Sequence, residues 1–112
     1  MIELESYASK LFGKEEAAYV PSGTFGNQCS IFTAGKAGEE IIIRDKSHII
    51  AHENGTIGRL TRMITRTLDC PKGYITPEDL KKYLRKNKDN QTPKTSILVL
   101  EQPTIEGLVV PL

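Results

Sequence analysis

The sequence predicts an α/β domain in which a mostly parallel β-sheet is flanked by helices. Apolar, β-branched runs alternate along the chain with segments of helical periodicity, and this alternation is typical of a parallel sheet. The run Ile41–Ile43 fits a strand that is covered on both faces. The length of 112 residues suits one domain with one modest core.

The first third of the chain predicts a helix, a strand and a second helix. Apolar side chains recur at helical spacing over residues 3–12, and Gly13 follows as a stop signal. Residues 17–20 are a short apolar run that Pro21 ends, and we expect them to form a strand. A sharp turn then leads into a helix expected over residues 25–36.

The remaining elements continue the alternation. Ser47 is a candidate N-cap of a short helix, while Thr76 as N-cap and Pro77 at the first helical position mark the start of another. We expect strands over residues 40–45, 62–68 and 95–100, helices over 47–54 and 76–86, and loops over 86–94 and 101–107. So few parallel strands would leave long exposed edges, so we expect an incomplete structural unit.

Composition and charge argue against several classes of function. A net charge of +1 gives no general attraction to nucleic acid or to an anionic membrane. No apolar run approaches the ~20 residues that span a bilayer, and the N-terminus does not have the pattern of a secretory signal. Cys29 and Cys70 lack metal-type spacing, and we expect reduced thiols in a cytoplasmic protein.

The turn Pro21–Asn27 has the composition of a phosphate site. Ser22 and Thr24 supply hydroxyl groups, and Gly23 lets the backbone approach a ligand closely. The helix that follows would point free N–H groups and its positive dipole end at the turn. A plain capped turn uses the same residues, and local sequence alone slightly favours that alternative. The turn matches neither the Walker nor the dinucleotide-binding pattern.

Two further groups follow predicted strands, at the edge where open α/β sheets bind ligands. His48 could stack on a flat aromatic cofactor or exchange a proton, but a purely structural role is equally compatible with its position. His48 and His52 are four residues apart, a spacing that metals use, but no third ligand follows, so we expect no metal. Residues 101–104 could line a pocket, or their polar groups could simply form the hydrogen bonds of their own loop.

Taken in order, these segments resemble the threonine aldolases and related β-eliminating lyases, which are fold-type I pyridoxal-phosphate enzymes. The match is sharpest at residues 20–28, where Val-Pro-Ser-Gly-Thr-Phe-Gly-Asn-Gln is similar to the family pattern V-P-S-G-T-x-G-N-Q. Weaker matches cover residues 4–13, 47–55, 73–80, 100–102 and 107–112. The resemblance therefore extends over nearly the whole chain.

The resemblance implies a fold, a cofactor and roles for particular residues. Residues 1–112 would be part of an aspartate-aminotransferase-like large domain, with the phosphate-binding loop at residues 20–28. The cofactor would be pyridoxal 5'-phosphate, its ring stacked on His48 and its phosphate bound by Ser22, Gly23 and Thr24. Thr104 would face the substrate. Glu53 matches a glutamate near the stacking histidine whose role the resemblance leaves open.

The resemblance also implies a function for a complete enzyme: the cleavage of threonine, a small amino-acid substrate, to glycine and acetaldehyde by a homo-oligomer. The Schiff-base lysine region and the C-terminal small domain have no counterpart in this sequence. We therefore expect the chain alone to be inactive. The alternatives are a non-catalytic phosphate-binding or assembly module, and a piece of another fold-type I enzyme such as a β-eliminating lyase or an aminotransferase.

Overall fold

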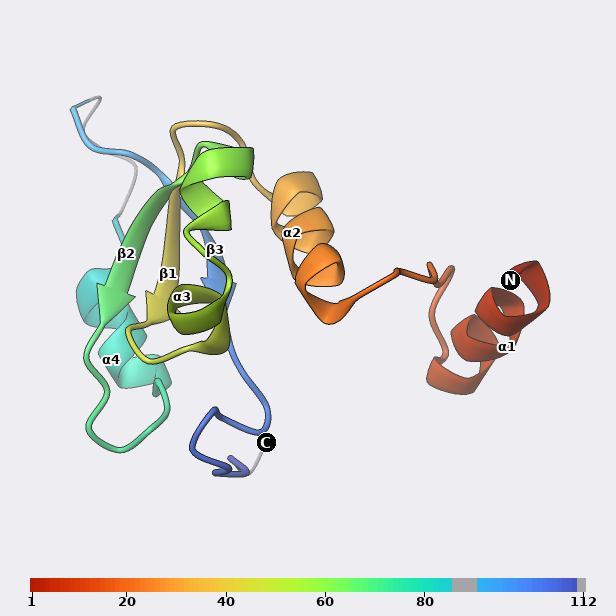
Figure 1. Ribbon diagram of the computed structural model, residues 1–112. Helices are drawn as coiled ribbons and strands as arrows, with labels where there is room; N and C mark the ends of the chain where they lie inside the picture. The colour runs from red at the N-terminus through yellow and green to blue at the C-terminus, as the bar shows by residue number, and fades with distance from the viewer. Residues whose placement is uncertain (86–90, 111–112) are drawn as a thin grey trace.

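A three-stranded parallel sheet forms the centre of the protein. The structure is a computed structural model that describes residues 1–85 and 91–110. The sheet has the order β2-β1-β3 (Figure 1) and consists of β1 (Glu40–Arg44), β2 (Ile64–Leu68) and β3 (Thr95–Val99). Both pairings are parallel. The predicted α/β class and parallel sheet are confirmed.

The central strand β1 is buried along its whole length. Ile41, Ile42 and Ile43 have no exposed surface, as expected for a strand with a neighbour on each side and helices on both faces. Because side chains alternate between the faces of a sheet, Ile41 and Ile43 pack into one core cluster. That cluster also contains Ile31, Ile49, Ile57 and Met63.

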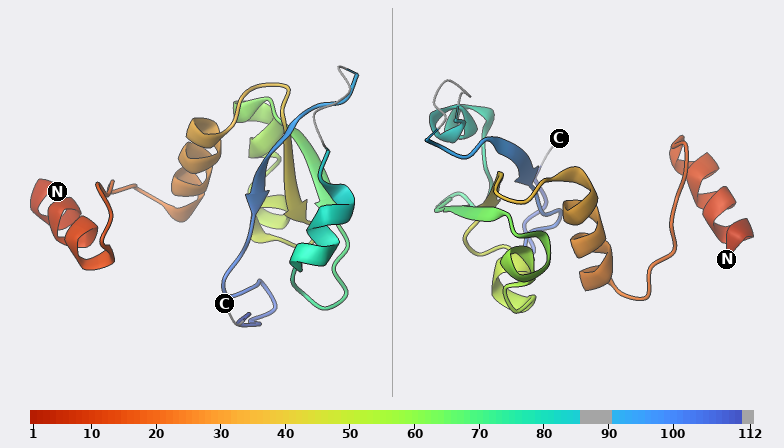
Figure 2. Two further views of the ribbon diagram at one scale, coloured as in Figure 1. Left: turned by 180° about the vertical axis from the view of Figure 1, so that it is seen from behind. Right: turned by 90° about the horizontal axis from the view of Figure 1, so that it is seen from above.

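The helices divide between the two faces of the sheet. The core cluster takes residues from α2 (Gly23–Ala34), α3 (His48–His52) and the π-helical turn η1 (Ile57–Thr61), so these elements cover one face. Helix α4 (Pro77–Tyr83) covers the other face, as the views from behind and above show (Figure 2). Arg66 of β2 attaches α4 to the sheet by donating to the Tyr83 carbonyl at 3.0 Å.

Helix α1 (Ile2–Phe12) stands apart from this body (Figure 1). It ends at Gly13, which has a φ of 61° and adopts the left-handed conformation that favours glycine. None of the residues of α1, all of which the structure describes, is buried. Its large apolar side chains are exposed: Ile2, Leu4, Tyr7, Leu11 and Phe12.

The predicted strand over residues 17–20 is wrong. The segment has no regular secondary structure, and no strand of the described chain pairs with it. Its Tyr19 N–H instead donates to Glu5 Oε1 at 2.7 Å. A short apolar run can adopt an extended backbone, but a strand also needs a partner for its N–H and C=O groups.

Several predicted boundaries shift by a few residues. Helix α2 begins at Gly23, two residues earlier than expected, because Ser22 caps it. Strand β2 begins at Ile64, since Arg62 has a left-handed φ of 56°, and η1 was not predicted. Helix α4 ends at Tyr83. Of the loop expected over residues 86–94, residues 86–90 lie outside the described residues.

Gly35 brings α2 close to the sheet. It follows the last residue of α2 and lies against the side chains of Met63 and Ile97. A Cβ atom at this position would overlap Met63 Sδ and would lie 2.9 Å from Ile97 Cδ1. The φ of −114° is open to any residue, so the constraint on this position is the lack of space.

Candidate functional site

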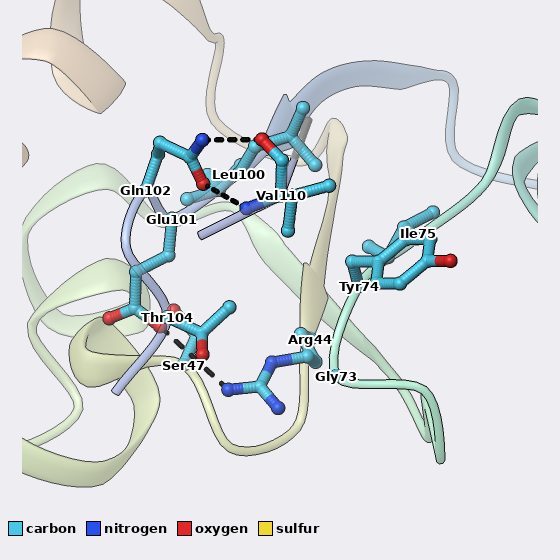
Figure 3. A pocket seen from close by; sticks show the side chains of 11 residues that line it. Arg44, Ser47, Gly73, Tyr74, Ile75, Leu100, Glu101, Gln102, Thr104 and Val110 are labelled. Atoms are coloured by element: carbon cyan, nitrogen blue, oxygen red, sulfur yellow. Dashed lines mark hydrogen bonds and ion pairs between the residues drawn. The ribbon is translucent and has the colours of Figure 1, made fainter. Parts of the chain in front are cut away.

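The candidate site lies at the carboxyl edge of the sheet, where the segments after β1 and β3 meet. Ser47 follows β1 and Glu101 follows β3, and both lie at this edge (Figure 3). His48, at the start of α3, donates its backbone N–H to Glu101 Oε1 at 3.0 Å. The segments after β1 and β3, which the sequence placed separately at the carboxyl ends of strands, are thus in direct contact.

The loop at residues 20–28, called the phosphate-type loop below, contains the solvent-exposed N-terminus of α2. The Ser22 hydroxyl oxygen accepts from the Phe25 N–H at 3.1 Å, and the Ser22 carbonyl accepts from the Gly26 N–H at 3.0 Å. The N–H groups of Gly23 and Thr24 precede this ladder, as at the start of any α-helix. Residues 21–25 are exposed, and a Cβ built at Gly23 meets no atom within 4 Å. An anion can therefore approach this backbone from solvent.

A buried carboxylate joins this helix to α3. The side chain of Glu53, the residue that follows α3, is 0% exposed. Asn27 Nδ2 donates to its Oε1 at 2.7 Å, and Gln28 Nε2 donates to its Oε2 at 2.6 Å. His48 Nε2 lies 3.9 Å from the same Oε1. Sequence reasoning placed Glu53 near His48 by resemblance but had no signal for its bonds to α2.

The imidazole of His48 is accessible. Its side chain is 50% exposed, and its ring centroid lies 5.4 Å from that of His52, with the two planes tilted by 40°. His48 and Asn27 line one cavity of about 270 Å³, together with Glu101 and Gln102. The cavity thus takes residues from α2, from α3 and from the loop after β3. Ser22, Gly23 and Thr24 lie outside it, one helical turn before Asn27.

A buried arginine fixes the loop after β3. Arg44, the last residue of β1, donates to both carboxylate oxygens of Glu106, at 2.9 and 2.6 Å, and lies 3.8 Å from Glu101 Oε2. The hydrogen bond from Arg44 lowers the pKa of Glu106 to about 2, and the same bond raises the pKa of Arg44. Sequence reasoning missed this pair. An arginine inside a strand that is otherwise buried does signal the need for a carboxylate partner, but it does not identify which carboxylate.

Thr104 is buried within that loop. Its Oγ1 accepts from the Leu108 N–H at 3.2 Å, and its own N–H donates to the Leu108 carbonyl at 2.9 Å. It lines a second cavity, of about 90 Å³, with Arg44 and Tyr74 (Figure 3). Gln102, which lines both cavities, exchanges two hydrogen bonds with the backbone of Val110. Thr104 and His48 therefore face different cavities that share a wall.

The described part of the chain holds neither a metal-type cluster nor a membrane-spanning helix. Within residues 1–85 and 91–110, no three His, Cys, Asp or Glu side chains are grouped so that they could hold a metal ion. Over the same residues, no helix has the length and apolar character needed to cross a membrane.

Comparison with known proteins gives a consistent result. The model of the beta-eliminating lyase family matches residues 1–112. A probable low-specificity L-threonine aldolase of Schizosaccharomyces pombe is 42% identical over 98% of this chain and 30% of its own length. Low-specificity L-threonine aldolase 1 of Arabidopsis thaliana is 34% identical over 88% of this chain and 28% of its own.

Solved structures agree with the sequence comparison. A structure of Leishmania major threonine aldolase superposes on 75% of this chain and 24% of its own, with a TM-score of 0.66 and 25% identity. This chain therefore spans about a third or less of the length of the relatives it matches.

Proposed function

The chain belongs to the beta-eliminating lyase family, and we propose that it is the N-terminal segment of a pyridoxal-phosphate lyase of the low-specificity threonine aldolase type. The complete enzyme would cleave threonine to glycine and acetaldehyde. The names of the similar proteins support this assignment. The structural observation that carries it is that α2, whose N-terminus is a phosphate-type loop, lines the same cavity as the exposed imidazole of His48.

The residues present fit the cofactor. A phosphate monoester needs several donors, and the exposed loop offers the N–H groups of Gly23 and Thr24 with the hydroxyls of Ser22 and Thr24. Ser22 accepts from Phe25 and can still donate its own hydroxyl hydrogen. A pyridine ring needs a flat partner, which the half-exposed His48 imidazole provides.

In this proposal, each residue has a defined task. Ser22, Gly23 and Thr24 bind the phosphate, and His48 supports one face of the ring. Thr104, from the neighbouring cavity, lies on the substrate side. When bound, the cofactor supplies an electron sink for bond cleavage at the amino-acid substrate.

We further propose that residues 1–112 form part of the large domain and that the Schiff-base lysine belongs to the complete protein rather than to this segment. No lysine is among the described residues that line the His48 cavity. Lys46, the lysine closest in sequence to His48, is exposed. The chain alone would then bind the cofactor without catalysing the reaction.

Equilibrium dialysis of the purified chain tests the cofactor assignment. We expect pyridoxal 5'-phosphate to bind more tightly than pyridoxal, because only the former has the phosphate that the loop recognises. Thr24→Ala should weaken binding about tenfold, since it removes a hydrogen bond to a charged group. Equal affinity for the two compounds would contradict the assignment. An absorption band that borohydride reduces, and that maps to a single lysine, would contradict the proposal that the Schiff-base lysine lies outside this segment.

We also propose that the complete protein is a cytoplasmic homo-oligomer. The exposed apolar side chains of α1 support association, because large apolar surfaces on soluble proteins mark contact sites. The free thiols Cys29 and Cys70 support a reducing compartment. Sedimentation equilibrium of the complete protein tests the proposed oligomer. We expect the apparent molecular mass to rise with protein concentration, and a monomer at all concentrations would contradict the proposal.

A further inference from the structure

We propose that Glu53 is a positioning residue that fixes the phosphate loop relative to His48. This inference rests on the proposed function, because it assumes that the loop and the imidazole bind two parts of one ligand. The loop and the imidazole belong to different helices, α2 and α3. A ligand that contacts both needs the two helices at one separation and angle.

The hydrogen bonds of Glu53 set that separation. Both of its carboxylate oxygens accept from α2, one from Asn27 at 2.7 Å and one from Gln28 at 2.6 Å. These are charge-assisted bonds of short length. Two bonds to two adjacent residues fix rotation as well as distance. The carboxylate is fully buried, and a buried charge without such partners would be strongly unfavourable.

The bonds are located where they can act on both parts of the candidate site. Asn27 lies three residues after Thr24 on α2, and Glu53 lies five residues after His48. At 3.6 residues per turn, these spacings are roughly one turn and one and a half turns, so both connections run through short pieces of backbone. On its other side, the His48 N–H is held by Glu101. His48 is thus fixed from the sheet edge and, through Glu53, from α2.

Glu53 acts on His48 mainly through the backbone. The separation of 3.9 Å between His48 Nε2 and Glu53 Oε1 is too long for a direct hydrogen bond. The imidazole therefore keeps its half-exposed position. Gln28 adds an independent observation: it is 94% buried, and its Oε1 has no partner among the described residues. Its amide can therefore turn over and offer an acceptor to the residue at position 53.

Two substitutions separate the hydrogen bonds from the charge. Glu53→Ala removes both bonds to α2. In Glu53→Gln, the new amide oxygen can accept from Asn27, and the new NH₂ group can donate to Gln28 Oε1 once the Gln28 amide turns over. The connection between the helices is then kept without the charge. Glu78→Ala, at an exposed glutamate of α4, is the matched control.

The test compares two ligands on the full chain. Inorganic phosphate reports the loop alone, whereas pyridoxal 5'-phosphate reports the loop and His48 together. We measure the first by phosphorus NMR and the second by absorption. We expect Glu53→Ala to weaken pyridoxal-phosphate binding about tenfold or more while phosphate affinity stays the same, because the advantage of two linked contacts depends on their spacing. Glu53→Gln should restore the preference, and Glu78→Ala should not alter it.

The outcomes distinguish this inference from the proposed function. If the unsubstituted chain shows no preference for pyridoxal 5'-phosphate over phosphate, the proposed function is wrong. If a folded Glu53→Ala chain keeps the full preference, or loses affinity for both ligands equally, the positioning role is wrong. If the far-UV circular dichroism shows that Glu53→Ala does not fold, Asn27→Ala replaces it in the test. Asn27→Ala removes one of the two bonds to Glu53 and leaves the carboxylate its bond from Gln28. An unchanged preference in that variant also overturns the inference.

Discussion

The sheet and the segment that precedes it are stabilised in opposite ways. In β1, three isoleucines are completely buried, and the charged residues at its two ends have partners on neighbouring elements. In residues 1–25, almost every side chain is exposed, including the apolar ones of α1. The sheet is therefore fixed by its own packing, whereas α1 and the segment after it depend on few contacts within this chain.

This difference divides the candidate site. The half that contains His48, Glu101 and Thr104 is fixed by the sheet and by hydrogen bonds at its edge. The half that contains Ser22–Thr24 is held through α2, which contributes Ile31 to the core. A ligand that contacts both halves would order the weaker one more than the stronger one.

The largest expected effect is a loss of stability on substitution in β1, compared with a substitution in α1. Ile42→Ala should lower the free energy of unfolding by about 2–5 kcal/mol, because it opens a cavity in a fully buried strand. Leu11→Ala, in exposed α1, should change it by less than about 0.5 kcal/mol. Urea denaturation followed by circular dichroism measures both values. A large loss in Leu11→Ala would show that α1 packs against something in solution, most simply another copy of the chain.

A second substitution examines the amino end of the sheet. Glu40 is 1% exposed, and its Oε1 accepts a hydrogen bond from Thr95 Oγ1 at 2.8 Å. Its Oε2 lies 3.2 Å from Arg85 Nε, and its Oε1 lies 3.6 Å from an Nη atom of Arg66. Glu40→Gln should cost about 1–3 kcal/mol, because two guanidinium groups lose their carboxylate partner. Denaturation of this variant beside Glu16→Gln, in the exposed segment after α1, measures the effect. Equal stability of the two variants would mean that water replaces the ion pairs at no cost.

A third comparison uses two matching N-caps. Ser22 caps α2 and Thr76 caps α4, each by accepting a backbone N–H at 3.1 Å. Loss of either cap by substitution with alanine should cost about 1 kcal/mol. Because the start of α2 is exposed, we expect Ser22→Ala to accelerate amide hydrogen exchange mainly at Phe25 and Gly26. Faster exchange throughout the sheet would show instead that the loop supports the whole fold.

The smallest expected effect is a pH dependence. The bond from Arg44 lowers the pKa of Glu106 from 4.5 to about 2. Because the folded-state pKa is depressed, this contribution to stability is complete above the unfolded pKa and is lost as the pH falls to about 2. Glu106→Gln should therefore be less stable than the unsubstituted chain at pH 7, with a difference that shrinks between pH 4.5 and 2. A difference that is constant over this range would mean that the pair contributes nothing.

Local rules were sufficient for most of the fold. Thr76 with Pro77 fixed the start of α4, and three adjacent isoleucines identified β1. Residues 17–20 were assigned wrongly because strand formation depends on a pairing partner, which local composition does not reveal. The π-helical turn at residues 57–61 was missed for another reason, which is that its sequence has no distinctive pattern.

Much less of the site could be predicted from neighbouring residues. The position of His48 beside Glu101 follows from parallel topology. The bonds between Arg44 and Glu106, and between Gln28 and Glu53, join residues 62 and 25 positions apart. Such pairs arise only when the chain is folded. One sequence contains no signal that selects these partners from the many charged residues available.

The close approach of α2 to the sheet has a consequence for how this gene can vary. At Gly35, every missense change adds at least a Cβ, and the ends of the Met63 and Ile97 side chains would have to move to make room for that atom. At Gly58, a Cβ meets no atom within 4 Å. A library of random variants selected for folding should therefore favour glycine more strongly at position 35 than at position 58. Two glycines that look alike in the sequence thus differ in how many substitutions evolution can accept at their positions.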